Sequence, residues 1–211
     1  MAVVGIVPAA GRGERLGATG PKAFVVCAGR PLIEWSLDVL RSVCDRVVVA
    51  VPPGFSYPDS VEGGPVRSDS VRRALAAAPE ATIAVVHDAA RPFVTRDLVE
   101  HCIAKLAQGF DGAIAAAPVT DTVKEVDDAG RVTRTLDRSR LWAIQTPQVF
   151  DAAVLRAALD VPLEVLAAAT DDASLVEAAG GSVCVVAAPP ENVKVTRARD
   201  LEQAALRLAS S

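Results

Sequence analysis

Residues 3–7 form a short β-branched run, Val-Val-Gly-Ile-Val, and a glycine-rich loop from Pro8 to Lys22 follows at once. A short apolar run of this kind, followed by a helical stretch, is typical of a buried strand in a parallel sheet. The loop is therefore expected to leave the carboxyl end of a central strand, where open α/β sheets bind their ligands. This arrangement favours a fold of alternating strands and helices with a binding site at the loop.

The loop has the composition of a polyphosphate site. Its glycines let successive backbone N–H groups point at an anion, and its cations are Arg12, Arg15 and Lys22. It lacks the Walker pattern, because Ala23 follows Lys22, and the dinucleotide pattern, because Leu16 occupies the third glycine position. Cations so placed favour stabilisation of charge that develops during a reaction. The alternative is a loose strand-to-helix turn with solvated basic residues.

No linker, repeat or low-complexity run divides the 211 residues, so we expect one domain over 1–211. Hydrophobic residues make up 51% of the chain and aromatic residues only 4%, which suits helices and buried strands built from Ala and Val. The net charge of −4 argues against nucleic-acid binding, which depends on neutralising many phosphates. The local cations are therefore expected to act on a small ligand.

Apolar periodicity and turn residues predict a Rossmann-like α/β fold, in which helices flank a mostly parallel central sheet. The expected strands span 3–7, 46–51, 82–87, 112–118 and 182–187. The expected helices span 31–43, 71–78, 95–109, 152–159, 161–169, 171–179 and 198–208.

A hairpin interrupts this alternation of strands and helices. Residues 122–127 and 131–136 alternate polar and apolar side chains on both sides of a turn that ends at Gly130. The segment 121–137 has too few apolar residues to form a core of its own. We therefore expect it to protrude as a β-arm and to pair with a second copy of the chain in a homodimer.

A second polar patch precedes the helix expected over 71–78. It combines Gly63 and Gly64 with Ser68, Asp69 and Ser70. One of these three polar side chains can simply cap the helix. Alternatively, glycine backbone and a serine hydroxyl at a strand end can contact the edge of a nucleobase.

Asp88 follows the expected strand 82–87 and so lies at the same edge of the sheet as the glycine-rich loop. A carboxylate repels a polyphosphate unless a divalent cation lies between them, and Mg²⁺ with oxygen ligands fits that need. The alternative is an ion pair between Asp88 and Arg91 that steadies a turn. His87 is expected to be a buried imidazole with satisfied hydrogen bonds rather than a metal ligand.

The four cysteines show no Cys-x-x-Cys spacing and are expected to be reduced core thiols. They are Cys27, Cys44, Cys102 and Cys184. The sequence shows no signal-peptide pattern and no apolar run of ~18 residues. We therefore expect a cytoplasmic enzyme with no membrane association.

Taken together, these motifs resemble the 2-C-methyl-D-erythritol 4-phosphate cytidylyltransferase family over nearly the whole chain. The matching segments are Pro8 to Gly11 with Arg15, Pro21 and Lys22; Gly63-Gly64 with Arg67 and Asp69 to Val71; Val86 to Pro92; Pro118 with Asp121 to Lys124; Asp137-Arg138 with Leu141-Trp142; Gln145 to Gln148; Thr170-Asp171 with Ala173-Ser174; and Asn192 to Thr196. The resemblance implies a nucleotidyltransferase that joins CTP to a sugar-alcohol phosphate, releases pyrophosphate and uses Mg²⁺. It also implies a homodimer whose arm completes the neighbour's substrate site.

The resemblance further implies a role for each matched residue. Catalysis, by stabilising the pentavalent transition state at the α-phosphate, falls to Arg15 and Lys22. The substrate phosphate is positioned by Arg138 and Lys194, and the erythritol moiety by Asp88, Arg91 and Thr122. Arg138 and Thr146 reach in from the partner subunit, and Asp88 is also the metal ligand. The nucleotide-binding residues are Ala9, Ala10, Gly11, Gly64 and Ser70.

One position departs from the family's pattern, and two alternative functions stay open. Pro65 stands where relatives often carry an acidic residue, and proline has no N–H to offer a base or ribose. A cytidylyltransferase for another polyol phosphate, such as ribitol 5-phosphate, needs the same phosphate clamp. A catalytically idle nucleotide-binding subunit would be expected to lack Arg15, Lys22 or Asp88, and all three are present.

Overall fold

The computed structural model describes residues 1–11, 13 and 20–210. Its centre is a seven-stranded sheet with the order β11-β7-β10-β6-β1-β4-β5. Among these described strands β10 alone runs antiparallel to its neighbours, which confirms the mostly parallel α/β fold. The strands are β1 (Val3–Pro8), β4 (Arg46–Val51), β5 (Ser60–Glu62), β6 (Ile83–Val86), β7 (Gly112–Pro118), β10 (Trp142–Asp151) and β11 (Val183–Ala187).

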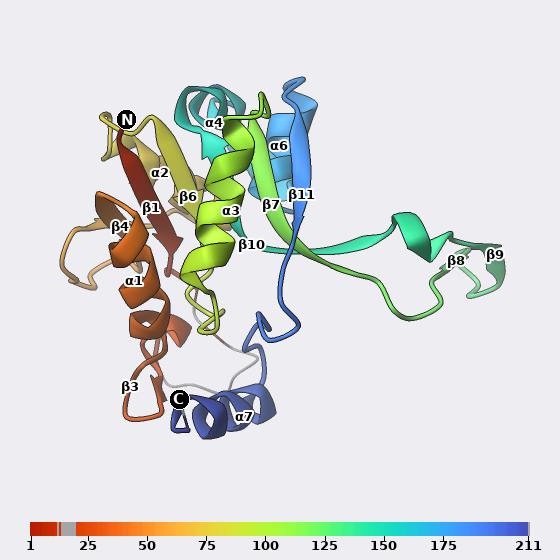
Figure 1. The fold of residues 1–211 in the computed structure, drawn as a ribbon, viewed down its shortest axis with the longest axis horizontal. Coiled ribbons are helices and arrows are strands. Elements are labelled where there is room, and N and C mark those ends of the chain that lie inside the picture. The colour runs from red at the N-terminus through yellow and green to blue at the C-terminus, as the bar shows by residue number, and fades with distance from the viewer. Residues whose placement is uncertain (12, 14–19, 211) are drawn as a thin grey trace.

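Helices cover both faces of the sheet, as Figure 1 shows. One face carries α1 (Leu32–Val43) and α3 (Arg96–Leu106). The other carries α2 (Arg67–Ala76), α4 (Ala152–Leu159), α5 (Leu163–Ala168) and α6 (Asp172–Ala178). The remaining helix, α7 (Ala198–Leu208), packs beside the small hairpin of β2 (Val26–Cys27) and β3 (Arg30–Pro31).

The apolar run of β1 explains its central position. Val4 and Ile6 lie in the core on one face of the sheet, and Val3 and Val7 lie in the core on the other. A strand buried on both faces needs a continuous apolar run, which is what residues 3–7 supply.

The first turn of α2 differs from the expectation. The helix begins at Arg67, four residues earlier than expected, and its N-cap residue Val66 makes no side-chain capping bond. The expectation that Ser68, Asp69 or Ser70 caps this helix is therefore wrong. All three lie buried within the first turn instead.

Two strands of the central sheet were not expected from the sequence, β5 and β10. The second is the more consequential, because it joins β6 to β7 through the middle of the sheet. Its register against β7 shifts between Ile144 and Gln148. Such an irregularity leaves residues of the longer strand outside the ladder, where they can face a site.

The expected hairpin is present. It consists of β8 (Lys124–Val126) and β9 (Val132–Thr135), followed by a short 3₁₀ helix, η3 (Arg138–Arg140). Figure 1 shows this β-arm, residues 121–137, extending well away from the body of the molecule. Every residue of its two strands is exposed, including Val126 at 53% and Val132 at 60%. The arm has no apolar core within the chain.

The four cysteines are free thiols; three are buried and Cys184 is partly exposed. Burial raises the pKa of Cys44 and of Cys102 to about 12, so these thiols stay protonated at neutral pH. In the described part of the chain, no helix combines the length and the apolar character needed to cross a membrane.

Candidate active site

The candidate site lies where the strand order of the sheet reverses. The chain first moves outward from β1 through β4 to β5, and then returns to the other side of β1 with β6. A crevice outside the carboxyl ends of the strands at such a point is the usual ligand site of an open α/β sheet. A cavity of about 320 Å³ lies here, lined by Arg67, Asp88, Arg91, Ile144, Gln145, Thr146, Gln148, Thr170, Asp171 and Lys194.

A row of four ionisable side chains, Lys194, Asp88, Arg67 and Asp172, begins in the wall of the cavity and ends at the buried Asp172 behind it. Lys194 Nζ donates to Asp88 Oδ2 at 2.6 Å, and Arg67 Nε donates to Asp88 Oδ1 at 3.1 Å. Arg67 also donates from Nη1 to Asp172 Oδ2 at 2.6 Å. The ion pair of Asp88 with Arg91, the alternative that the sequence left open, is not formed, because the carboxylate pairs with cations from α2 and from the segment before α7.

The row keeps Asp88 ionised. Burial alone would raise the pKa of this carboxyl, but the charges of Arg67 and Lys194 outweigh that effect and hold the pKa well below its usual range. Asp172 lacks a second cation, and because it is fully buried its pKa is raised despite the charge of Arg67. Asp88 therefore presents a fixed negative charge to the cavity at neutral pH.

Arg91 lies beside Asp88 with part of its guanidinium unsatisfied. Its Nη1 donates to the carbonyl oxygen of Asn192 at 2.8 Å, while its buried Nε has no partner among the described residues. Burial lowers the pKa of Arg91, although a guanidinium stays protonated at neutral pH. An unsatisfied buried donor is costly, so a ligand oxygen bound here would relieve that cost.

Thr146 and His87 fix the backbone of Asp88 through a chain of hydrogen bonds. The amide of Asp88 donates to Thr146 Oγ1 at 3.0 Å, and Thr146 Oγ1 lies 3.1 Å from His87 Nδ1. His87 Nε2 lies 3.1 Å from the carbonyl oxygen of Arg91, so Nε2 carries the proton and Nδ1 accepts from the Thr146 hydroxyl. The imidazole is satisfied and buried, as expected from the sequence.

This chain of hydrogen bonds predicts a specific pH dependence of stability. Burial lowers the pKa of His87 to about 4 from an ordinary 6.5. Between these two pH values the unfolded state therefore binds a proton at His87, whereas the folded state does not. The contribution of His87 is complete above the unfolded pKa and is lost as pH falls from about 6.5 toward 4. Between pH 7 and pH 5 the loss amounts to about 2 kcal/mol.

The variant His87→Gln should lose less stability than the wild type over that pH interval, even though it is less stable at pH 7. Urea unfolding of both proteins at pH 7 and pH 5 measures the difference. Equal losses in the two proteins would mean that the pKa of His87 is the same in the folded and the unfolded state.

Three of the expected nucleotide-binding residues, Ala10, Gly64 and Ser70, lie together around Gly63 and the first turn of α2. The amide of Gly63 donates to the carbonyl oxygen of Val51 at 2.7 Å, and a Cβ at Gly63 would lie 2.5 Å from that of Ala10. The amide of Gly64 donates to Ser70 Oγ at 3.0 Å, so this hydroxyl fixes the glycine backbone. Gly64 must be a glycine because a Cβ there would lie 1.8 Å from Asp69 Oδ2.

The glycine-rich loop is described at its two ends. Lys22 begins a short 3₁₀ helix, η2 (Lys22–Phe24), and its amide donates to the carbonyl oxygen of Gly11 at 3.3 Å. Ala9 is buried, and its amide donates to the carbonyl oxygen of Ala50 at 2.8 Å. Arg15, the other expected catalytic cation, lies outside the described residues.

Two expectations about the substrate residues change. Thr146 was expected to reach into a partner's site, but it is 4% exposed and bonded to the backbone of Asp88 in its own chain. Thr122 was expected beside Asp88 and Arg91, but it is exposed at the base of the β-arm and does not line the cavity. Arg138 lies in the same region, where its Nη1 donates to the carbonyl oxygen of Thr120 at 2.7 Å.

The described protein groups do not by themselves fit a resident metal site. Within residues 1–11, 13 and 20–210, no group of three or more His, Cys, Asp or Glu side chains is placed to hold a cation. Each oxygen of Asp88 already accepts a hydrogen bond from a cationic side chain. Metal binding by Asp88 stays a prediction that these contacts do not support.

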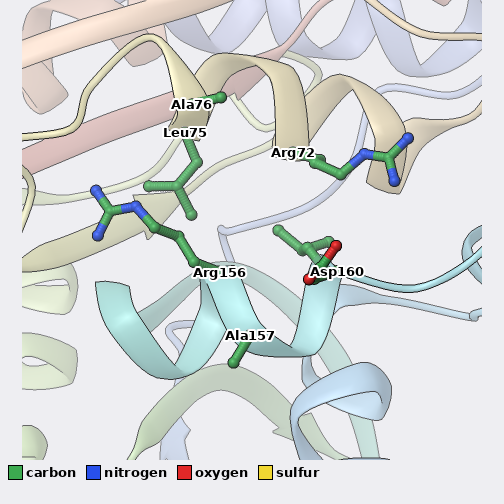
Figure 2. A pocket seen from close by; sticks show the side chains of 7 residues that line it. Arg72, Leu75, Ala76, Arg156, Ala157 and Asp160 are labelled. Atoms are coloured by element: carbon green, nitrogen blue, oxygen red, sulfur yellow. The ribbon is translucent and has the colours of Figure 1, made fainter.

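A larger cavity, of about 380 Å³, lies between α2 and α4. Figure 2 shows Leu75 and Asp160 facing it, while the guanidinium groups of Arg72 and Arg156 point away from each other. Arg72 is paired with Asp69, and Arg156 donates to backbone carbonyls at 2.8 and 3.2 Å. Both cations are satisfied within the protein, and neither residue is among the expected site residues.

A Rossmann-like sheet with a glycine-rich loop and a cationic pocket at its switch point has the architecture of a nucleotide-dependent transferase. A model of the family described as 2-C-methyl-D-erythritol 4-phosphate cytidylyltransferase matches residues 3–210. The chain therefore belongs to that family.

Individual relatives agree along their whole length. The protein of that name from Nocardia farcinica is 46% identical over 96% of this chain and 92% of its own. The one from Saccharopolyspora erythraea is 43% identical over 99% and 100%. The crystal structure of the enzyme of that name from Thermus thermophilus has a TM-score of 0.83 at 38% identity and covers all of both chains.

Two residues of the charge row were given no role from the sequence, Arg67 and Asp172. Arg67 stands three residues after Gly64 and Asp172 stands next to Asp171, so both lie inside polar patches that the sequence does reveal. Nothing in the sequence shows that these two patches meet, because that contact depends on how α2 and α6 pack.

Proposed function

We propose that this chain joins CTP to 2-C-methyl-D-erythritol 4-phosphate, forming 4-diphosphocytidyl-2-C-methyl-D-erythritol and pyrophosphate in non-mevalonate isoprenoid precursor biosynthesis. Membership of the family over residues 3–210 carries the proposal. The charged cavity beside the Gly64 backbone supports it, because the reaction needs a phosphate clamp next to a nucleotide site.

The reaction requires the protein mainly to position the two substrates and to neutralise their negative charge. A phosphomonoester dianion is already a nucleophile, so no general base is required, and the barrier is the approach of two anions in line. Lys22 and Arg15 are proposed to stabilise the charge that grows on the α-phosphate. His87 is not available as a base, since its Nδ1 accepts from Thr146 and its Nε2 donates to a carbonyl.

The polyol phosphate is proposed to bind in the 320 Å³ cavity. Lys194 faces the cavity as a point charge for the phosphate, and Asp88 offers carboxylate oxygens to hydroxyl groups. Arg91 is the third contact, because its unsatisfied Nε needs an acceptor. The hydroxyl of Thr146 keeps one lone pair for a ligand after its two bonds within the chain.

Release of pyrophosphate tests the substrate directly. The purified protein, supplied with CTP and Mg²⁺, should turn over 2-C-methyl-D-erythritol 4-phosphate far faster than ribitol 5-phosphate or glycerol 3-phosphate. A preference for ribitol 5-phosphate would replace the proposed substrate by its rival. No release with any of the three would support an idle nucleotide-binding subunit.

Comparing KM for the polyol phosphate with KM for CTP tests whether Arg138 and Lys194 hold the substrate phosphate. Replacing Arg138 or Lys194 by alanine should raise KM for the polyol phosphate about 10-fold or more and leave KM for CTP nearly unchanged, because only one substrate loses a contact. Arg140→Ala is the matched control, since Arg140 is exposed on the same 3₁₀ helix and has no proposed role. An equal rise in both KM values would place Arg138 or Lys194 on the nucleotide side.

Three further features belong to the same proposal. Mg²⁺ is expected to arrive with the triphosphate, whose oxygens supply most of its ligands. The β-arm is expected to embrace a second copy of the chain, since its exposed Val126 and Val132 have no partner surface within the described chain. A cytoplasmic location agrees with four free thiols.

A further inference from the structure

Arg67 bridges two carboxylates that come from different parts of the fold. It is the first residue of α2, and it reaches Asp88 after β6 and Asp172 at the start of α6. A planar guanidinium can hold two carboxylates at fixed angles, which a single ammonium cannot. Arg67 therefore fixes the orientation of the Asp88 carboxylate relative to α2 and α6.

The far end of this bridge is rigid. Asp172 is fully buried, and its Oδ1 has no partner among the described residues, so Arg67 is its principal contact. The start of α6 is tied to β10 by Gln148, which donates to Asp171 Oδ2 at 2.8 Å and accepts from the amide of Ala173 at 3.3 Å. Arg67 is thus anchored to the core of the sheet and not to a surface loop.

Lys194, the other cation paired with Asp88, cannot hold the carboxylate in place alone. Lys194 has one ammonium group, and in the proposed function that group must also meet the substrate phosphate. A carboxylate whose sole cation moves toward a phosphate loses its counter-charge at the moment when substrate arrives. A second, permanently held cation on Asp88 removes this conflict.

We propose that Arg67 is a positioning residue for the polyol phosphate: it holds Asp88 in place through the anchor Asp172 and so leaves Lys194 for the substrate phosphate. This inference rests on the proposed function of the same cavity. It predicts that the bridge, and not merely the positive charge, is needed at position 67.

The test is Arg67→Lys, which keeps the charge and gives up the two-point bridge. KM for 2-C-methyl-D-erythritol 4-phosphate should rise about 10- to 100-fold, as expected for a ligand group misplaced by around an ångström. KM for CTP should change less than about 3-fold, because no contact of Gly64 or Ser70 is altered. A purely structural defect would affect both substrates.

Arg46→Lys is a control that makes the same substitution at a bridge between more exposed carboxylates. Arg46 also bridges two carboxylates, Asp59 at 2.7 Å and Glu80 at 3.0 Å, and its side chain is 36% exposed against 33% for Arg67. It lies at the amino end of β4, away from the cavity. Its replacement should leave both KM values unchanged.

A second variant guards against loss of the fold. Arg67→Gln combined with Asp172→Asn removes the bridge without leaving a buried carboxylate unpaired, and it should show the same selective rise in KM. A folded Arg67→Lys protein, or a folded double variant, with the wild-type KM for the polyol phosphate would overturn the proposal. An equal rise for CTP would do so too, whereas a wild-type protein inactive with this substrate pair would instead refute the proposed function.

Discussion

Lys22→Ala is expected to lower kcat on the order of 10²- to 10³-fold while the protein stays folded. That loss corresponds to about 3–4 kcal/mol of transition-state stabilisation. The attraction of a cation beside the α-phosphate increases as negative charge accumulates there. The effect should therefore appear in kcat rather than in KM for either substrate.

The described ends of the loop explain why Lys22 is well placed for this role. The described ends of the loop lie against each other: the carbonyl oxygen of Gly11 accepts from the amide of Lys22, and a Cβ at Gly13 would lie 2.5 Å from that of Lys22. Gly13 has a φ of +72°, which favours glycine, and this tight turn brings the lysine against the loop backbone. Such a cation is held in place before the substrate arrives.

Steady-state kinetics with saturating CTP and polyol phosphate measure the effect. Lys105→Ala is a suitable control, because Lys105 lies on α3 and its ammonium bonds only a neighbouring glutamine side chain. Circular dichroism establishes that each variant is folded. A folded Lys22→Ala enzyme with the wild-type kcat would remove Lys22 from the catalytic group.

The sheet was largely predictable because its parallel strands are buried on both faces. Residues 3–7 and 47–51 are continuous apolar runs, and such runs have few alternatives to a central strand. The hairpin was predictable for a different reason, since polar and apolar residues alternate around a glycine turn. In both cases the deciding signal is local.

The strand β10 was not predictable, because its pairing overrides its composition. Polar residues from Gln145 to Gln148 interrupt the apolar pattern, and the irregular register at this point reflects the same interruption. Thr146 was placed in a partner's site because of the family resemblance and its position just beyond the β-arm. Without β10 in the centre of the sheet, nothing fixes Thr146 beside His87 and Asp88 of its own chain.

Ion pairs between distant segments are equally hidden from the sequence. The sequence offered Arg91, three positions away, as one possible partner of Asp88, yet its partners are Arg67 and Lys194, 21 and 106 residues away. A charged side chain in a cleft takes whichever partners the packing brings to it. Motifs therefore locate the residues of a site, while the contacts among them depend on the tertiary fold.

Mixing two impaired variants, assayed with the polyol phosphate well below its wild-type KM, should restore activity if the site is shared between subunits. Arg138 lies at the base of an arm that extends away from the body, and the residues lining its own chain's cavity do not include it. Lys22 and Lys194 belong to the body. If the arm completes the neighbour's site, each active site combines Lys22 of one chain with Arg138 of the other.

A heterodimer of Lys22→Ala and Arg138→Ala chains then has one site with both defects and one site with none. Random assembly from equal amounts gives heterodimers as about half of all dimers, so about a quarter of the sites should regain wild-type activity. Co-expression with two affinity tags isolates the heterodimer, in which about half of the sites should be active. The matched control pairs Lys22→Ala with Lys194→Ala: both residues belong to the same body, every heterodimer site keeps one defect, and activity should stay at the level of the parent variants. If the first pair also restores nothing although heterodimers form, Arg138 acts within its own chain, and a fully active monomer in sedimentation would exclude the shared site altogether.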